Sequence, residues 1–282
     1  MTAPAVVPPI LVTSHVLSDP ADLAPPSGLD TTTYSLMKHG DLTAVRAMAG
    51  PLAERLVREV PELVEHPAVP VFPVAYKAVR PACWFLADAV LTIVTAARAE
   101  RGLAPGRIVR IAKDSVTVTD YASSSATARE EEMRHIGFQL EEDVDGAQVV
   151  LIDDVRVTGL AERAALNTLA AATPLRTVLA YVAVIEGDLA SDPSIEARLN
   201  HAFVESVAAM APAARAGDFA LTIRFLKRLL RAPAPERATF LATCPPPLLE
   251  AIVDGADATG ADFSSRFSAE LDEIRGLLAV TA

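Results

Sequence analysis

The residues best suited to chemistry in this sequence are concentrated in one short segment, residues 149–161, which reads VVLIDDVRVTGLA. Four apolar residues lead into Asp153 and Asp154, and the pair Thr158-Gly159 follows. This order predicts a buried strand that ends in two carboxylates and turns into a helix. Because ligands of open α/β sheets bind outside the carboxyl ends of the strands, we expect a ligand site here.

The groups at this turn suit a phosphorylated sugar. A helix N-terminus presents unpaired N–H groups to phosphate, Gly159 permits close approach of the backbone, and Thr158 adds a hydroxyl donor. Asp153 and Asp154 can accept hydrogen bonds from vicinal hydroxyls, stabilise positive charge on a ribose ring, or help to hold Mg²⁺ through water. The segment therefore predicts a site for a ribose phosphate.

Two alternatives remain beside this interpretation. The first is purely structural: a buried strand is followed by two exposed acids that cap the next helix. The second is the acidic strand of an ATPase. The sequence contains no GxxxxGK[ST] segment to hold the nucleotide phosphates, which argues against the second alternative.

The elements that position the segment follow from apolar runs and helix breakers. Helices are predicted at residues 42–65, 81–101 and 159–172, and strands at Val69–Tyr76, Arg107–Ala112, Gln148–Asp153 and Thr177–Ile185. Strands that alternate with helices, and that are apolar throughout, predict an α/β fold with a parallel sheet flanked by helices.

The chain divides into three predicted parts. Residues 1–66 form an N-terminal arm and hood helix, residues 67–190 the α/β core, and residues 191–282 a helical annex. Within the arm, residues 1–30 are predicted to be irregular, although the apolar stretch VVPPILV can still pack on the body. Helices of the annex are predicted at Ile195–Ala209, Phe219–Arg231, Ala238–Ala256 and Ser264–Leu278.

Composition and charge argue against several classes of protein. A net charge of −11 argues against a general nucleic-acid binder, which would carry a basic face. Cys83 and Cys244 cannot form a disulfide framework, and no Cys/His cluster has zinc spacing. No basic segment followed by an apolar one suggests a signal peptide. The apolar stretch Ala82–Ala97 is short for a membrane span and contains Asp88, so a buried helix and a cytoplasmic protein are expected.

The order of strand, acidic pair and Thr-Gly loop resembles the signature of type I phosphoribosyltransferases. The resemblance implies that Asp153 and Asp154 grip the ribose hydroxyls as the catalytic pair. It also implies that the loop holds the 5′-phosphate, chiefly through main-chain N–H groups of Arg156, Val157, Thr158, Gly159, Leu160 and Ala161. Val157 and Ala161 depart from the family pattern, which has hydroxyl residues there, so fewer side-chain donors remain.

The resemblance implies two further loops. A pyrophosphate loop should follow the first core strand, where the sequence has Lys77, Ala78, Val79 and Arg80 without the glycine that is frequent in the family. The alternative for this segment is a solvated basic turn. A second loop, residues 113–140, should close over the site, with Arg110 and Lys113 near its base reaching pyrophosphate and Asp120-Tyr121 touching the acceptor.

A closer resemblance covers about residues 34–230. Tyr34–Asp41, Asp120–Ala122, Asp153–Glu162 and Thr222–Lys227 together look like a divergent branch of phosphoribosyltransferase-like proteins, often encoded near tellurium-resistance or specialised-metabolite genes. This branch implies accessory or acceptor-binding roles near the site for Tyr34, Lys38, Glu162, Arg224 and Lys227. Glu162 has the alternative role of an ordinary acid at a helix N-terminus.

The implied reaction is Mg²⁺-dependent transfer of ribose 5-phosphate from phosphoribosyl pyrophosphate to an unidentified small-molecule acceptor, with release of pyrophosphate. Asp153 and Asp154 would contact the Mg²⁺, directly or through water, and a homodimer without nucleic-acid or membrane partners is expected. Two alternatives remain open. One is a non-catalytic sensor of phosphoribosyl pyrophosphate or nucleotides, and the other is a relative that cleaves nucleotides in the reverse direction.

Overall fold

A computed structural model describes residues 8–23, 28–115, 136–192 and 194–281. Within these residues a six-stranded sheet has the order β1-β6-β5-β2-β3-β4. Its strands are β1 (Ile10–Leu17), β2 (Pro70–Tyr76), β3 (Arg107–Lys113), β4 (Phe138–Leu140), β5 (Gln148–Arg156) and β6 (Arg176–Ile185). Neighbouring strands are parallel except β3 and β4, which are antiparallel. The predicted α/β fold with a mainly parallel sheet is confirmed.

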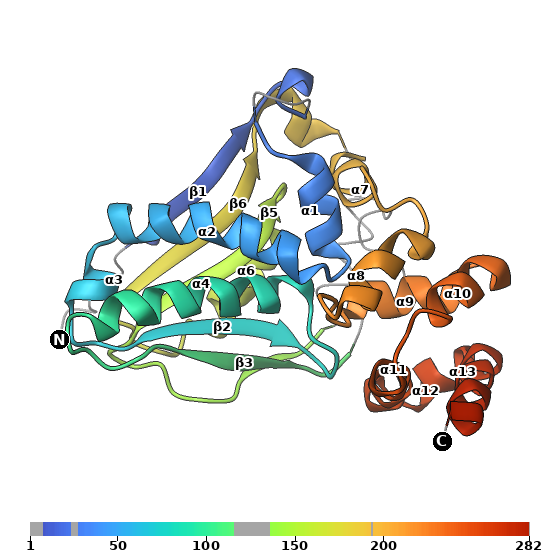
Figure 1. Cartoon of the computed structure of the whole chain (residues 1–282). Coiled ribbons are helices and arrows are strands. Elements are labelled where there is room, and N and C mark those ends of the chain that lie inside the picture. The colour runs from blue at the N-terminus through green and yellow to red at the C-terminus, as the bar shows by residue number, and fades with distance from the viewer. Residues whose placement is uncertain (1–7, 24–27, 116–135, 193, 282) are drawn as a thin grey trace.

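Helices cover both faces of the sheet. Helices α2 (Leu42–Glu59) and α4 (Ala82–Ala99) lie together over one face, and α6 (Leu160–Thr168) belongs to the other (Figure 1). Successive side chains of a strand point to opposite faces. Val150 and Ile152 of β5 therefore join the core under α2 and α4, while Val149 and Leu151 join the core beside α6. This double burial explains the continuous apolar run of β5.

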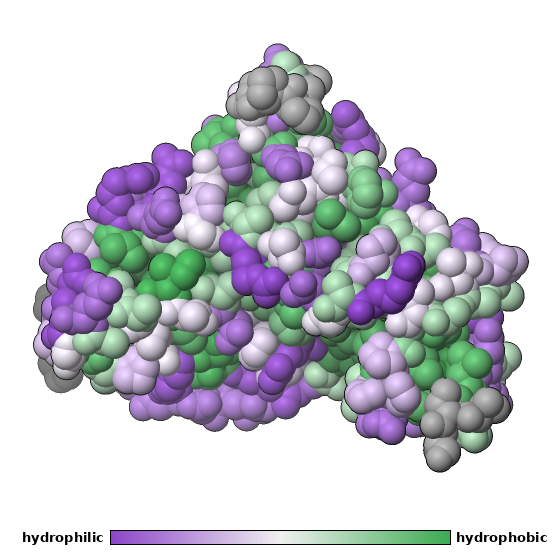
Figure 2. Space-filling view, viewed as in Figure 1, coloured by the Kyte–Doolittle hydropathy of each residue, from purple (hydrophilic) through white to green (hydrophobic). Residues whose placement is uncertain are grey.

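Helix α4 is the one helix in the described residues that is long and apolar enough to cross a membrane. Its Leu86, Ala87, Val90 and Val94 are fully buried in the core, which confirms the predicted buried helix. Figure 2 shows apolar patches broken up by hydrophilic side chains over the face that carries α2 and α4.

The N-terminal part differs from the prediction. Ile10–Leu17, expected in an irregular arm, forms the edge strand β1 and pairs in parallel with β6. The short helix α1 (Thr31–Lys38) begins where the Asp30 carboxylate accepts from the Thr33 N–H, and the sequence patterns did not predict it. The predicted helix over residues 42–65 breaks after Glu59, and α3 (Glu62–Glu65) follows Pro61.

The C-terminal residues form a helical layer with a core of its own. Its helices are α8 (Ala211–Ala216), α9 (Ile223–Arg231), α10 (Ala234–Leu241), α11 (Pro246–Thr259), α12 (Ala261–Arg266) and α13 (Ser268–Thr281). Helix α7 (Ile195–Asn200) precedes them and buries Ile195 and Leu199 in the core of the body. The described chain also has short 3₁₀ helices: η1 (Pro20–Leu23) after β1, η3 (Gly187–Ser191) after β6, and η4 (Val207–Met210) before α8. Several of the long helices that we predicted are therefore broken into shorter ones. The exact three-part division of the chain stays a prediction.

Backbone contacts join this annex to the body beside the carboxyl ends of β2 and β3, which point toward it (Figure 1). The Ala220 N–H donates to the Gly40 carbonyl at 2.8 Å, and the Ile223 N–H donates to the Arg80 carbonyl at 3.0 Å. Gly40 has a φ of 103°, and a Cβ there would lie 2.1 Å from the Ala220 oxygen. The close approach of the annex therefore requires glycine at this position.

Candidate active site

The acidic pair lies at the carboxyl end of β5, and its two members meet different surroundings. Asp154 is buried and faces α1, where the Tyr34 hydroxyl donates to its Oδ2 at 2.5 Å. The Lys38 ammonium forms an ion pair with the same oxygen. Tyr34 and Lys38 are four residues apart on α1 and therefore lie on one face of the helix. Helix α1 thus holds Asp154 in place from above the strand.

The charges of this cluster are settled by burial and by the ion pair. Burial raises the pKa of Asp154, but the Lys38 charge and the hydrogen bonds to Asp154 outweigh this effect and leave that pKa well below its usual value. Burial likewise opposes the charge on Lys38, and Asp154 more than compensates, so the pKa of Lys38 is raised. Asp154 and Lys38 are therefore both ionised in the folded protein.

Asp153 behaves in the opposite way. Burial, followed by the negative charge of Asp154, raises the pKa of Asp153 well above its usual value. Its Oδ1 accepts a hydrogen bond from the Asp154 N–H at 2.9 Å. Asp153 is therefore the member of the pair that takes up a proton more readily, and a nearby positive charge favours its ionisation.

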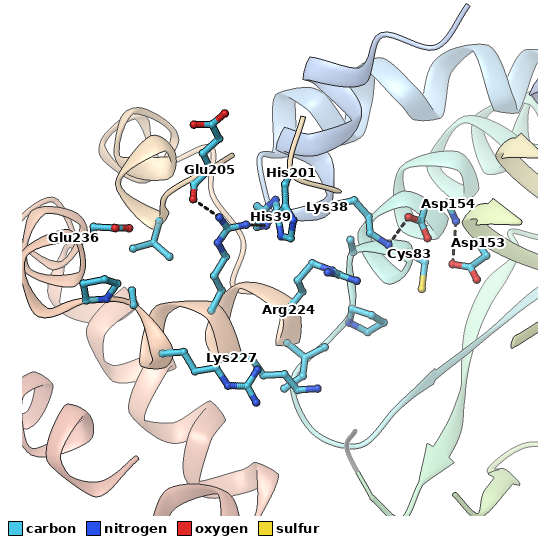
Figure 3. A pocket seen from close by; sticks show the side chains of 18 residues that line it. Lys38, His39, Cys83, Asp153, Asp154, His201, Glu205, Arg224, Lys227 and Glu236 are labelled. Atoms are coloured by element: carbon cyan, nitrogen blue, oxygen red, sulfur yellow. Dashed lines mark hydrogen bonds and ion pairs between the residues drawn. The ribbon is translucent and has the colours of Figure 1, made fainter. Parts of the chain in front are cut away.

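Two cavities meet at this pair, one of about 260 Å³ and one of about 570 Å³. Lys38, Asp153 and Asp154 line both of them. Figure 3 shows the larger cavity with the acidic pair on one side and residues of the annex on the other. A ligand that occupied both cavities would pass directly over the two carboxyl groups.

The smaller cavity is built by the loop after β5. All six residues that we predicted to bind the ribose phosphate line it, namely Arg156, Val157, Thr158, Gly159, Leu160 and Ala161. Gly159 has a φ of 67°, in the left-handed region that favours glycine, and α6 begins at the next residue. The first N–H groups of α6 have no carbonyl partner within the helix. The loop therefore has the geometry of an anion site.

Glu162, in the first turn of α6, also lines this cavity. The Tyr181 hydroxyl donates to its Oε2 at 2.8 Å, and the Arg156 Nε lies 3.0 Å from the same oxygen. Glu162 therefore holds the Arg156 side chain beside the phosphate loop. This contact goes beyond the general effect of an acid at a helix N-terminus.

The larger cavity receives side chains from α9. Arg224 and Lys227, which we predicted to be accessory residues, both line it. Glu196 of α7 lies 3.8 Å from the Arg224 guanidinium. Tyr34 does not line either cavity and reaches the site through its bond to Asp154.

The predicted pyrophosphate residues are not gathered in one place. Lys113 lines the smaller cavity, and burial lowers its pKa. The Arg110 guanidinium donates to the Tyr76 carbonyl at 3.3 Å and to the Lys77 carbonyl. The Arg80 guanidinium lies 3.7 Å from the centre of a Trp84 ring.

The rest of that segment faces the annex. Lys77 lines a third cavity, of about 390 Å³, together with residues of α12. Ala78 and Val79 are half-buried, and Val79 packs on Gly255 of α11, where a Cβ would lie 2.8 Å from its Cγ2. Asp120 and Tyr121 lie outside the described residues.

Several residues at the site were not predicted from the sequence. His39, Cys83, His201, Arg228 and Arg231 line the larger cavity. One signal could have found the two arginines. Arg228 and Arg231 follow the predicted residues Arg224 and Lys227 at helical spacing, which places all four on one side of a helix. No comparable pattern marks the histidines.

The fold and the loop after β5 define the class: an α/β protein with a loop of anion-binding geometry at the carboxyl end of its sheet. The model of the family described as PRTase ComF-like matches residues 17–256, which is most of the chain, and the chain belongs to this family. The resemblance to type I phosphoribosyltransferases is thereby confirmed. The link of the narrower branch to tellurium-resistance or specialised-metabolite genes stays a prediction. No curated protein sequence matches the chain.

Among solved structures, the chain is similar to hypoxanthine-guanine phosphoribosyltransferase of L. donovani. The TM-score is 0.33 at 12% identity, over 57% of this chain and 76% of that one. For hypoxanthine phosphoribosyltransferase of Trypanosoma cruzi in complex with the product IMP, the TM-score is 0.33 at 14% identity, over 53% and 79% of the two chains. For a hypoxanthine phosphoribosyltransferase from Staphylococcus aureus, the TM-score is 0.29 at 10% identity, over 53% of this chain and 76% of that one. These similarities are too distant to support an argument about activity.

Proposed function

We propose that this protein is a phosphoribosyltransferase that transfers ribose 5-phosphate from phosphoribosyl pyrophosphate to a small-molecule acceptor. The observation that carries the proposal is the position of Asp153 and Asp154 at the junction of the phosphate-loop cavity and the larger cavity. The 5′-phosphate would bind at Arg156–Ala161, and the ribose would lie over the two acids. Its C1 carbon would then face the larger cavity, where an acceptor has room.

The chemical step needs positioning and charge more than covalent help from the protein. The bond between C1 and the pyrophosphate oxygen breaks, and pyrophosphate leaves with the electron pair. A lone pair of the acceptor forms the new bond to C1, and the acceptor gives up a proton to solvent if it carries one. Positive charge on the ribose during this step favours ionisation of Asp153, which supplies a second negative charge beside Asp154.

Mg²⁺ fits this site only with help from the substrate. The described residues contain no group of three or more His, Cys, Asp or Glu side chains that could hold a metal ion. Asp153, directly or through water, and the oxygens of the substrate would hold Mg²⁺ together, as is usual for this ion. When bound, Mg²⁺ would neutralise charge on pyrophosphate and make it a better leaving group.

A protein that binds phosphoribosyl pyrophosphate or a nucleotide without transfer is the second candidate. It is favoured by the contacts of two predicted pyrophosphate-binding residues. Arg80 stacks on Trp84, and Arg110 donates to the carbonyls of Tyr76 and Lys77. Both side chains would have to leave these partners to reach pyrophosphate.

One experiment separates these candidates. The full chain is titrated with phosphoribosyl pyrophosphate and Mg²⁺ by calorimetry, and pyrophosphate release is then measured with a panel of acceptors. Transfer predicts both binding and acceptor-dependent release. Binding without release favours the second candidate. If neither binding nor release is observed, the ribose-phosphate site has no support. Consumption of a nucleotide that requires pyrophosphate would select the reverse reaction.

Variants locate the activity at the acidic pair. Asp153→Asn should abolish transfer and weaken binding, because the neutral amide cannot oppose positive charge on ribose. Asp88→Asn, the same change at an exposed position of α4, is the matched control and should behave as the unaltered protein. A homodimer and a cytoplasmic location remain part of the proposal, and analytical ultracentrifugation tests the first of them.

A further inference from the structure

Helix α9 has one apolar face and one cationic face. Its Phe225, Leu226, Leu229 and Leu230 are buried in the core of the annex. Its other face carries Arg224, Lys227, Arg228 and Arg231, which we call the α9 cationic face. Positions i, i+3, i+4 and i+7 of a helix lie on one side, and all four of these side chains line the larger cavity.

Arg228 is held in a fixed position within this face. Its Nη1 lies 3.1 Å from His39 Nε2, and its Nη2 donates to the Glu205 carbonyl at 2.5 Å. His39 is itself buried, with Nδ1 lying 2.8 Å from the Ser35 carbonyl. A carbonyl can only accept, so Nδ1 carries the hydrogen and Nε2 is free to accept from Arg228.

Neither of these two contacts brings a negative charge to Arg228. Burial, reinforced by the neighbouring arginines, lowers the pKa of His39 to about 3, so the imidazole is neutral near pH 7. The other partner is a backbone carbonyl. These two contacts therefore orient the guanidinium without cancelling its charge, unlike the contact of Lys38 with Asp154.

The balance of charge along the cavity favours an anion. The described acids that line it are Asp153, Asp154, Glu205 and Glu236. The described cations are Lys38 and the four residues of the α9 cationic face, which makes five cations against four acids. This local excess of positive charge occurs in a chain of net charge −11.

The cavity is larger than a bare anion requires. Its volume of about 570 Å³ lies within the range of small-molecule sites. Val207, Ile223, Ala232 and Pro233 add apolar wall beside the cations. This combination suits an organic body that bears an anionic group.

We propose that the larger cavity binds an anionic acceptor, with its carboxylate or phosphate on the α9 cationic face and its nucleophile toward Asp153. The assignment of the bound anion as the acceptor rests on the proposed function, whereas the anion site itself does not. The pyrophosphate of the donor is the other possible source of an anionic group at this face. The experiment must therefore separate the two.

The probes are matched pairs that differ in one carboxylate, orotate against uracil and nicotinate against nicotinamide. Calorimetry measures their binding to the full chain, with and without ribose 5-phosphate. Charge-assisted hydrogen bonds to Arg228 should make each carboxylate bind about tenfold or more tighter than its neutral match. Arg228→Gln should remove most of this preference. Arg215→Gln on α8 is exposed, lies outside the cavity lining and should preserve it.

A separate titration with inorganic pyrophosphate tests the other source. If Arg228→Gln weakens pyrophosphate binding while carboxylates and their neutral matches bind equally, the α9 cationic face holds the leaving group and the proposal is wrong. A carboxylate preference that depends on Arg228 supports it. This readout is independent of turnover. A preference without pyrophosphate release in any transfer assay would remove the proposed function and leave the anion site standing.

A positioning role for His39 has its own test. His39→Phe removes the ring nitrogen that accepts from Arg228. It should reduce carboxylate affinity and leave the affinity for the neutral match unchanged, because only the guanidinium loses its orientation. A loss of equal size for both probes would point to general damage. In that case the change Lys227→Gln, at a half-buried position on the same face, decides whether the face binds carboxylates.

Discussion

Lys38 of α1 and Asp154 of β5 form a buried ion pair that joins the N-terminal helix to the carboxyl end of a central strand. The Tyr34 hydroxyl completes the contact by donating to the same carboxylate oxygen. Two charges removed from water stabilise a fold only through each other. Asp154 therefore has a structural task that is separate from any contact with substrate.

Asp154→Asn is expected to destabilise the protein by about 3–5 kcal/mol, because it removes the carboxylate that is paired directly with the buried Lys38 ammonium. Lys38→Met should cost a similar amount for the opposite reason. The double variant should lose much less than the sum of the two. Urea unfolding of the four proteins measures this coupling. Additive losses would show that the pair does not interact as described.

Asp153→Asn should have the opposite effect on stability. Burial and the charge of Asp154 raise the pKa of Asp153, so the folded protein keeps a proton that the unfolded chain releases above pH 3.8. Stability is therefore lost as the pH rises through this window. An amide does not titrate, so the variant should unfold at a higher temperature than the unaltered protein near pH 7.

Thermal unfolding at pH 4 and pH 7 checks this prediction, with binding of ribose 5-phosphate measured in parallel. The gain in stability should grow with pH and accompany a loss of binding, as is common for residues kept for function. Asp88→Asn is the exposed control. A midpoint below that of the unaltered protein at pH 7 would contradict the prediction.

The part of this site that the sequence could predict consists of residues that lie close together in the chain. The apolar run of β5, the two acids and the Thr158-Gly159 turn are consecutive, and the structure keeps them together around one cavity. The bond of Tyr34 to Asp154 spans 120 positions. The family resemblance implied that these residues are near each other, but no local pattern specifies the pairing.

The other differences also have physical reasons. Arg80 lies four residues before Trp84, and its guanidinium stacks on that ring instead of projecting toward the acids. Strand β1 follows two prolines and lies at the edge of the sheet, where a weak strand pattern suffices because only one neighbour must be matched. Helix α1 has eight residues, too few for a clear helical period.

Gly159→Ala separates backbone strain from phosphate binding. Gly159 and Gly146 have φ values of 67° and 66°, and a Cβ would meet no close contact at either position. Each change to alanine should therefore cost about 1–2 kcal/mol of stability through left-handed strain alone. Only Gly159→Ala should also weaken binding of ribose 5-phosphate, because it lies in the loop. Equal binding by both variants in calorimetry would remove Gly159 from the anion site.

His39 should make the stability of the protein depend on pH. Burial lowers its pKa from 6.5 to about 3, so below pH 6.5 the unfolded chain takes up a proton that the folded protein does not. The stability that neutral His39 contributes is thus complete above pH 6.5 and is lost as the pH falls toward 3, at up to about 1.4 kcal/mol per pH unit.

His39→Gln removes this titration. The difference in unfolding free energy between the two proteins, measured by urea denaturation from pH 4.5 to pH 8, should therefore be constant above pH 6.5 and shrink below it. Parallel curves for the His39 variant and the unaltered protein over the whole range would mean that the imidazole takes up a proton within the fold, and Arg228 would then lose its neutral acceptor.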